Sequence, residues 1–280
     1  MTHDHPVFAD NPIDGEVSLS TGPAPRPYHV YDGEGLLIFG HADPACVDEF
    51  LTGEDLYPVL HVSGRVAAGF IIADFREASM GPHHELQFFI LASQKPGETI
   101  SDAAVALPLA MALRPEWGTL CVRLWNDTST VVAYNNEYLG LNAELADFDL
   151  FARRDNAIGF HVSLKDGQSI IHGRAREANA TPLSVFWKML RYAGLRQLIN
   201  LGRMPFAPGH VINRVSSVLT ENRKAQIFTS SDHNVLRNWE KEVDRLDIGE
   251  PGLAQIDFQP VAVQNLRPFR FVYRHPDHPA

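Results

Sequence analysis

Short apolar runs separated by turn residues dominate the chain from Leu36 onward. Most of these runs have the length and the β-branched or aromatic content of buried strands. Asp166-Gly167 lies between two of them, and this dipeptide is a strong signal for a β-hairpin. The expected strands are residues 36–39, 65–75, 85–91, 120–125, 130–134, 158–164, 169–176, 258–263 and 269–273. The pattern therefore predicts a protein built mainly from strands.

Helical patterns are fewer than strand patterns. Asp43 followed by Pro44 is typical of a helix start, and we expect that helix to end near Leu51. Residues 181–201 carry apolar side chains at helical spacing, and the more polar residues 231–246 form a third expected helix. Because strands and helices do not alternate regularly, a βαβ series is not expected.

One large domain accounts for most of the sequence. Residues 1–27 are rich in Pro, Gly, Asp and Ser and show no periodicity, so we expect an irregular N-terminal arm. Residues 28–280 contain all the expected strands and helices, and no internal repeat divides them. The fold class that follows is mainly β (α+β), with a single antiparallel sheet domain and peripheral helices.

Composition and charge narrow the classes of partner. Apolar residues make up 45% and charged residues 21% of the chain, as in ordinary globular proteins. The net charge of 24 − 34 = −10 argues against nucleic-acid binding driven by phosphate contacts. No signal-like segment opens the chain, no apolar stretch reaches about 18 residues, and the two cysteines are far apart. These features predict a cytoplasmic protein with no nucleic-acid and no membrane partner.

Several motifs of nucleotide-binding and hydrolytic enzymes are missing from the sequence. It contains no glycine-rich dinucleotide fingerprint, no phosphate-binding loop, no Gly-x-Ser-x-Gly elbow and no His-Glu-x-x-His helix. Nucleotide chemistry and hydrolysis by a catalytic triad are therefore not expected, and no cofactor is predicted.

The densest group of chemically active side chains surrounds Glu85. At the start of an expected strand, His83, Glu85 and Gln87 point to one face, whereas His84 points to the other. A carboxyl beside imidazole and amide groups in an apolar cavity is suited to acid–base chemistry, because burial raises its pKa toward neutrality. The alternative is that Glu85 is exposed, or is satisfied by a hydrogen bond at the strand end.

A metal site is a further alternative for the same segment. His83 and Glu85 could join His61, His161 or His172 in an imidazole–carboxylate site. With 13 histidines in the chain, chance pairings are expected, and none of these spacings is distinctive. We therefore predict no metal.

The order of the segments resembles the acetoacetate decarboxylase superfamily. Gly81-Pro82-His83-His84-Glu85 is similar to the family's Gly-x-Tyr-x-Glu stretch, and Asn126-Asp127 to its Asp-Asn pair. Residues 131–140, the 158–176 hairpin and residues 256–260 also have similar counterparts, so the resemblance runs from about Tyr28 to the end of the chain. It implies a closed, cone-like antiparallel β-barrel around an apolar cavity, and a homo-oligomer. It also implies chemistry in which a lysine forms an imine with a β-keto acid.

Only Glu85 matches the functional residues of that family. Ala143 stands where the resemblance places the imine lysine, and Glu144 where it places the activating lysine. His41 stands in place of an arginine and Phe70 in place of a second glutamate. The whole chain has five lysines, and none has a sequence environment typical of a desolvated cavity lysine. Imine chemistry is therefore not expected.

Two hypotheses about function remain. The first is a lyase, hydratase or isomerase acting on a small oxo-acid or polyketide-like substrate, with Glu85 and His83 as the catalytic pair. The substrate-binding residues expected under this hypothesis are His41, Phe70, Gln87, Trp125 and Glu144. The second is a non-catalytic protein that binds a small molecule on the same scaffold. Under both hypotheses, a small molecule is the expected partner.

Overall fold

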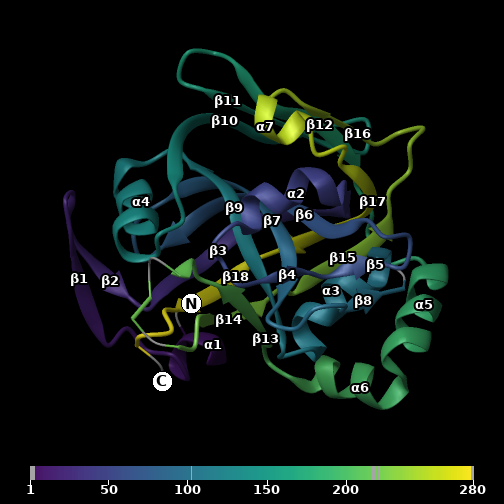
Figure 1. The fold of residues 1–280 in the computed structure, drawn as a ribbon, viewed down its shortest axis with the longest axis horizontal. Helices are drawn as coiled ribbons and strands as arrows, with labels where there is room; N and C mark the ends of the chain where they lie inside the picture. The colour runs from purple at the N-terminus through teal and green to yellow at the C-terminus, as the bar shows by residue number, and fades with distance from the viewer. Residues whose placement is uncertain (1–3, 102, 216–217, 220, 279–280) are drawn as a thin grey trace.

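The structure is a computed structural model that describes residues 4–101, 103–215, 218–219 and 221–278. Strands predominate, and 16 of them belong to one large sheet, as Figure 1 shows. The predicted mainly β (α+β) fold class is therefore confirmed. The sheet is mixed, however, because three strand pairings among the described residues are parallel instead of antiparallel.

Seven strands of this sheet pair in a closed cycle. Each hydrogen-bonds to the next, and the last returns to the first. In order around the ring they are β3 (Tyr28–Ala42), β6 (Val66–Ala78), β7 (His83–Ser93), β9 (Trp117–Asn126), β13 (Ala207–Ile212), β14 (Lys224–Ser230) and β18 (Arg270–Arg274). Six of the seven pairings are antiparallel, and only β9–β13 is parallel.

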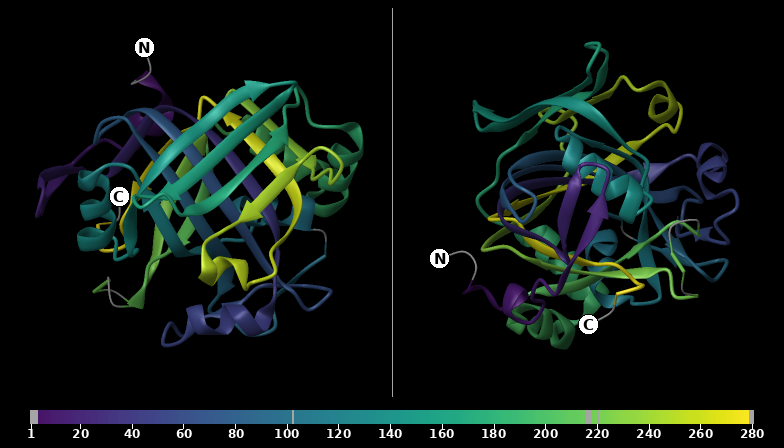
Figure 2. Two further views of the ribbon diagram at one scale, coloured as in Figure 1. Left: turned by 90° about the horizontal axis from the view of Figure 1, so that it is seen from above. Right: turned by 90° about the vertical axis from the view of Figure 1, so that its left-hand side faces the viewer.

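A second layer of strands extends the sheet beyond β9 and crosses the outside of the ring, as Figure 2 shows. Its strands are β10 (Ala143–Arg154), β11 (Ala157–Leu164), β12 (Ser169–Arg176) and β16 (Arg245–Ile248). β10 runs parallel to β9 because the chain between them turns back through α4 (Ser129–Ala133) and a π-helix, η2 (Tyr134–Tyr138). The sequence pattern predicted a strand at residues 130–134, where α4 and η2 are found.

Smaller strands complete the sheet. β17 (Gln259–Arg267) pairs with the second half of β3 and with β15 (His233–Asn238), while three two-residue strands lie at the edges. These three are β4 (Tyr57–Pro58), β5 (Leu60–His61) and β8 (Thr99–Ile100). The expected helix at residues 231–246 is wrong, because this segment forms β15 and β16. Asp244 and Arg237 are both buried, and the carboxylate of Asp244 accepts hydrogen bonds from the guanidinium of Arg237. This pair orders the turn between the two strands.

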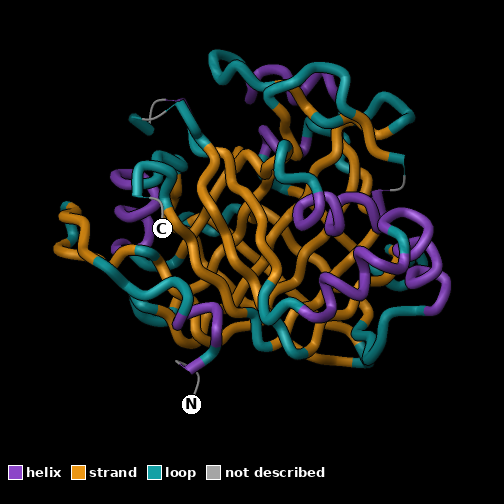
Figure 3. The backbone as a smooth tube through the Cα atoms, turned by 90° about the horizontal axis from the view of Figure 1, so that it is seen from below, coloured by secondary structure: helices purple, strands orange, loops and turns teal. Residues whose placement is uncertain are grey.

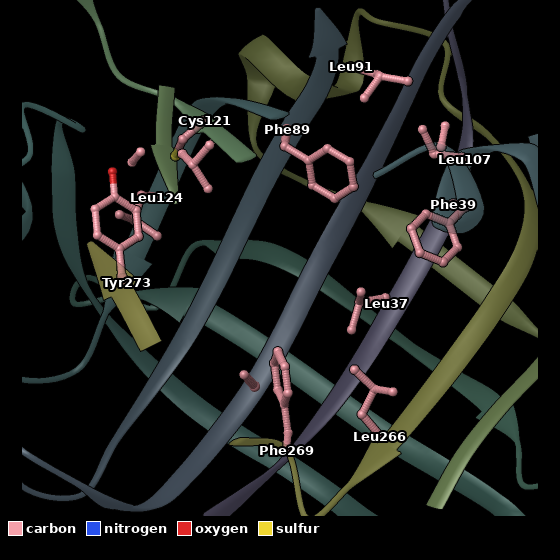
Figure 4. Packing of buried hydrophobic residues seen from close by; sticks show 14 of the residues in the cluster. Leu37, Phe39, Phe89, Leu91, Leu107, Cys121, Leu124, Leu266, Phe269 and Tyr273 are labelled. Carbon is pink, nitrogen blue, oxygen red and sulfur yellow. The ribbon is translucent and has the colours of Figure 1, made fainter. Parts of the chain in front are cut away.

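Alternation of side chains along the strands divides the core in two. On β6, Ile71 and Phe75 face the inside of the ring, whereas Phe70 and Ile72 face outward, toward the second layer. Figure 4 shows the inner cluster, in which Phe89 packs among aliphatic and aromatic side chains from several strands. The outer cluster fills the space between the ring and the second layer.

A β-bulge in β9 changes which residues face inward. Phe88 pairs with Arg123 and Phe89 with Cys121, so Val122 is the extra residue. Before the bulge, Cys121 belongs to the inner cluster. After it, Leu124 faces inward and Trp125 packs in the outer cluster.

Helices cover the ends and one side of the ring. α2 (Pro44–Leu51) begins where the sequence predicts, with the side chain of Asp43 accepting the Ala45 N–H. α3 (Ala103–Leu113) contributes to the inner cluster, and α5 (Leu183–Ala193) packs against α3. The expected helix 181–201 is two helices, α5 and α6 (Leu195–Arg203), because Gly194 between them has a φ of +77°. α7 (Pro251–Ala254) is a single turn.

The segment before Tyr28 is ordered, in contrast to the irregular arm that its composition predicts. Residues 4–27 form α1 (Pro6–Ala9) and a hairpin of β1 (Gly15–Leu19) and β2 (Gly22–Arg26). Pro23 and Pro25 lie in β2, and because proline is unusual in strands the sequence pattern does not predict one here. A hairpin at the edge of the fold tolerates proline.

None of the described helices is long and apolar enough to cross a membrane.

Candidate active site

A cavity lies inside the ring of strands, and every strand of the ring contributes at least one residue to its wall. Its volume is about 90 Å³, which is enough for a few waters or a small organic molecule. Most of the wall is apolar, as the inward-facing Leu124 and Phe269 in Figure 4 illustrate. Its polar side chains are Tyr28, Glu85, Gln87, Thr119, Asn135, Thr229 and Tyr273.

Glu85 is the only acidic residue in this wall, and among the described residues that line the cavity there is no Lys, Arg or His. Its side chain is half-buried and lines the cavity. Burial raises the pKa of Glu85 to about 7, although a hydrogen bond from Asn126 opposes the rise. A carboxyl with this pKa exchanges its proton near neutral pH, which suits a general acid or base.

Two asparagines connect Glu85 to the π-helix. The Asn126 side-chain amide donates to Glu85 Oε2 at 3.4 Å and to the carbonyl oxygen of His84 at 3.1 Å. Asn135 Nδ2 donates to Asn126 Oδ1 at 2.8 Å. Because a backbone carbonyl can only accept, the contact with His84 fixes the orientation of the Asn126 amide. The two residues hold one carboxylate oxygen of Glu85 in place.

His83 does not line the cavity itself, but it is hydrogen-bonded to Tyr28, which does. Its Nδ1 lies 2.8 Å from the carbonyl oxygen of Gly81, which can only accept, so Nδ1 carries the proton. The other nitrogen, Nε2, lies 2.8 Å from the Tyr28 hydroxyl and accepts its hydrogen. Burial lowers the pKa of His83, so the ring stays neutral. Tyr28 therefore presents its oxygen lone pairs, not its proton, to the cavity.

Gln87 lies on the same face of β7 as Glu85, and both line the cavity. Its side chain is hydrogen-bonded to Cys121, whose thiol is fully buried. Burial raises the pKa of this thiol, so Cys121 is neutral and is not an activated nucleophile.

Four of the predicted substrate-binding residues do not line the cavity: Phe70, Trp125, Glu144 and His41. Phe70 packs against Phe88 and Phe258 outside the ring, and the β9 bulge turns Trp125 to the same outer side. Glu144 is exposed on β10.

His41 has the inward parity of Leu37 and Phe39 but lies at the end of β3. Its ring centroid is 4.4 Å from that of His61, and burial with this neighbour lowers the pKa of His41 to about 4. A neutral imidazole at that place is unsuited to holding a substrate carboxylate.

Lysines are absent from the cavity wall. Ala143, where the resemblance places the imine lysine, is buried in the inner cluster at the start of β10. All five lysines lie within the described residues, and none lines the cavity. Lys224, which is half-buried, donates to the carbonyl oxygen of Pro115.

The histidines considered for a metal site are not brought together around Glu85. His161 and His172 pair on β11 and β12 in the outer layer, with ring centroids 6.2 Å apart. In the part of the chain that the structure describes, no three His, Cys, Asp or Glu side chains are grouped so as to hold a metal ion.

Sequence reasoning missed Tyr28, Asn126, Asn135 and Tyr273 as site residues. Asn126 and Asn135 belong to segments that support the family resemblance, which was the available signal. Tyr28 opens β3, and Tyr273 is on the last strand, where its hydroxyl donates to Asn213 Oδ1 at 2.7 Å. Nothing local marks these two tyrosines, because the closure of the ring is what brings β3, β7 and β18 around one cavity.

Neither a family model nor a curated protein matches this sequence. Solved structures do match. Acetoacetate decarboxylase from Legionella pneumophila has a TM-score of 0.59 and 13% identity, over 98% of this chain and 94% of that chain. The enduracididine biosynthesis enzyme MppR complexed with pyruvate has a TM-score of 0.53 and 12% identity, over 93% and 95% of the two chains. The chain therefore has the acetoacetate decarboxylase-like fold.

Proposed function

We propose that this chain is an enzyme that binds a small oxo compound inside the ring and moves a proton with Glu85, without forming a lysine imine. The reactions that fit are hydration, dehydration, isomerisation and retro-aldol cleavage, each of which needs proton transfer beside a carbonyl group. The supporting observation is the buried Glu85 carboxyl, with its pKa near 7, in the wall of a mostly apolar cavity.

The cavity favours a small substrate over a polyketide-like one. A volume of about 90 Å³ is smaller than the ~150 Å³ engineered cavities that accept benzene. An acid of a few carbon atoms fits this space better than a polycyclic compound. MppR, which has the same fold, is described as complexed with pyruvate, a compound of this size.

The charge of the substrate sets the role of Glu85. The described wall contains no cationic side chain, so a substrate carboxylate would raise the pKa of Glu85 and keep it protonated. An oxo-acid therefore meets Glu85 as a general acid. An uncharged carbonyl compound leaves about half of Glu85 ionised near pH 7 and able to act as a base.

Other polar groups of the wall can bind the carbonyl oxygen. The side-chain amides of Gln87 and Asn135 carry N–H donors, and Asn135 uses one of its two for Asn126. Such donors stabilise the negative charge that develops on an enolate oxygen. The oxygen of Tyr28 is an acceptor for a substrate hydroxyl or a water, because its own proton goes to His83.

Deuterium exchange tests this proposal without knowledge of the full reaction. Pyruvate, acetone and other small carbonyl compounds are incubated with the protein in D₂O, and loss of the α-proton signals is followed by NMR. We expect at least one probe to exchange faster with the wild type than with Glu85→Gln. The exposed Glu144→Gln variant is the matched control and should behave as the wild type does.

A non-catalytic binding protein is the second candidate, and the apolar wall of the cavity favours it. Under this alternative no probe exchanges its protons faster than in buffer. Thermal shift should then detect binding of the same probes equally to the wild type and to Glu85→Gln. That pair of results would contradict the enzymatic proposal.

A further inference from the structure

Two helices project from one side of the molecule beside α3, as Figures 1 and 3 show. α5 and α6 meet at Gly194 and form an amphipathic pair. α5 is fastened to the inner core by the buried Val185, whereas α6 has no buried residue. A surface helix normally buries its apolar stripe, so the apolar stripe of this pair requires an explanation.

Large apolar side chains gather on the outer face of the pair. Six of the 13 large apolar residues that are exposed in the described chain fall within residues 183–204. Leu183 is 68% exposed, Trp187 54% and Leu195 60%. We call these six residues the α5–α6 face: Leu183, Phe186, Trp187, Leu195, Ile199 and Met204. Leu183, Phe186 and Trp187 on α5 are spaced by three and four, and Leu195 and Ile199 on α6 by four, so those on each helix lie along one stripe, and Met204 directly follows α6.

The charge of this segment is opposite to that of the rest of the protein. Residues 183–204 contain Lys188, Arg191, Arg196 and Arg203 and no Asp or Glu, so they carry +4. With a total of −10, the remaining chain carries −10 − 4 = −14. Within the described residues, Arg191, Arg196 and Arg203 have no carboxylate partner.

We propose that the α5–α6 face binds the surface of an anionic lipid bilayer. An amphipathic helix with Trp, Phe and Leu on one side and Lys and Arg on the other lies in the plane of a bilayer interface. The apolar side chains enter the boundary between headgroups and acyl chains, and the basic side chains contact the anionic headgroups. The composition of the chain predicts no membrane partner. The proposal differs because the net charge of the whole chain hides a local cationic segment.

Charge also separates this partner from a second copy of the chain. A two-fold symmetric dimer through the α5–α6 face would place the same patch against itself. Arg191, Arg196 and Arg203 of one copy would then oppose the same three arginines of the other, whereas an anionic bilayer neutralises them. Charge therefore disfavours a two-fold contact through this face, whereas an anionic bilayer fits both its apolar and its charged residues.

The native tryptophans provide a direct test with the full-length protein. Trp117 and Trp125 are buried and Trp239 is half-buried, so Trp187 is the exposed member of the four. Vesicles of phosphatidylcholine with phosphatidylglycerol should bind the protein and shift its tryptophan emission to shorter wavelength. Vesicles of phosphatidylcholine alone should bind it far more weakly, and added salt should weaken the binding.

Variants identify the surface. Trp187→Glu with Leu195→Glu should abolish co-sedimentation with anionic vesicles. The control variant, Ile13→Glu with Val62→Glu, adds the same charge at exposed apolar positions elsewhere on the protein. It should retain most of the co-sedimentation with anionic vesicles. Each of Arg191→Gln and Arg203→Gln should weaken binding about fivefold. Circular dichroism and melting temperature check that each variant is folded.

Two results would overturn the proposal. One is failure of the wild type to bind anionic vesicles, whatever its oligomeric state. If light scattering then shows a dimer that Trp187→Glu dissociates, the α5–α6 face joins two copies of the chain. The other is vesicle binding that the Trp187→Glu/Leu195→Glu variant retains, which would place the lipid contact elsewhere.

Discussion

Asn126 Nδ2 donates a hydrogen bond to Glu85 Oε2 at 3.4 Å across the paired strands β9 and β7. The two residues are directly opposite in the register. This bond favours the charged form of Glu85, whereas burial favours the neutral form and is the stronger influence. The balance leaves the carboxyl close to half-ionised at neutral pH.

Removing that donor should raise the pKa of Glu85 further. In Asn126→Ala the carboxylate loses the hydrogen bond that stabilises its charge. If deuterium exchange uses Glu85 as a base, the exchange rate rises with pH as Glu85 ionises. The rising limb of this pH–rate profile should move to higher pH in the variant. A limb at the wild-type pH would show that Asn126 does not act on Glu85. Asn136→Ala changes an asparagine that binds the Ala143 backbone instead, and should leave the limb in place.

The pKa of Glu85 also predicts how stability changes with pH. The carboxyl ionises near pH 4.5 when unfolded and near 7 when folded, so between these values the unfolded state binds fewer protons. The wild type should therefore lose stability, relative to Glu85→Gln, as pH rises through this window. Below it the effect is absent, and above it the difference should reach on the order of 3 kcal/mol.

Urea unfolding at several pH values measures this difference. Glu144 is exposed, so Glu144→Gln should show no comparable change across the same window. A Glu85→Gln variant whose stability follows that of the wild type at every pH would mean that Glu85 ionises as an ordinary surface carboxyl.

The pairing of Tyr28 with His83 should contribute to stability. Tyr28→Phe leaves the buried Nε2 of His83 without its donor, which typically costs about 1–3 kcal/mol. Tyr57→Phe removes a hydroxyl from an exposed tyrosine and should cost almost nothing. Equal free energies of unfolding for the two variants would contradict the assigned hydrogen bond.

Borohydride reduction tests the absence of imine chemistry. No lysine lines the described cavity wall, so reduction in the presence of acetoacetate or pyruvate should leave the mass of the protein unchanged. A covalent adduct, mapped to a lysine by peptide mass spectrometry, would show that one of the five lysines reaches the substrate.

The sequence predicted the individual strands better than their arrangement. Apolar runs such as residues 65–75 and 85–91 gave strands near their true positions, because local composition determines them. The polar pattern of residues 231–246 is ambiguous and predicts a helix. What makes it two strands is pairing with β17 and β12, which are distant in the sequence.

The candidate site was predictable where parity along one strand decided the answer. Glu85 and Gln87 share a face of β7 and line the cavity, as alternation requires. Trp125 was misplaced because the extra residue Val122 reverses the alternation in β9, and no local sequence signal marks that bulge. Tyr28 could not be identified as a wall residue until the closed ring of strands was known.

An NMR titration tests most directly whether Glu85 is a buried carboxyl that titrates near neutrality. The protein is labelled with ¹³C at the glutamate side-chain carboxyl, and Glu85→Gln identifies the resonance that belongs to Glu85. We predict that this resonance titrates with a pKa of about 7, well separated from those of the exposed glutamates. Titration near 4.5, together with the exposed glutamates, would contradict the account.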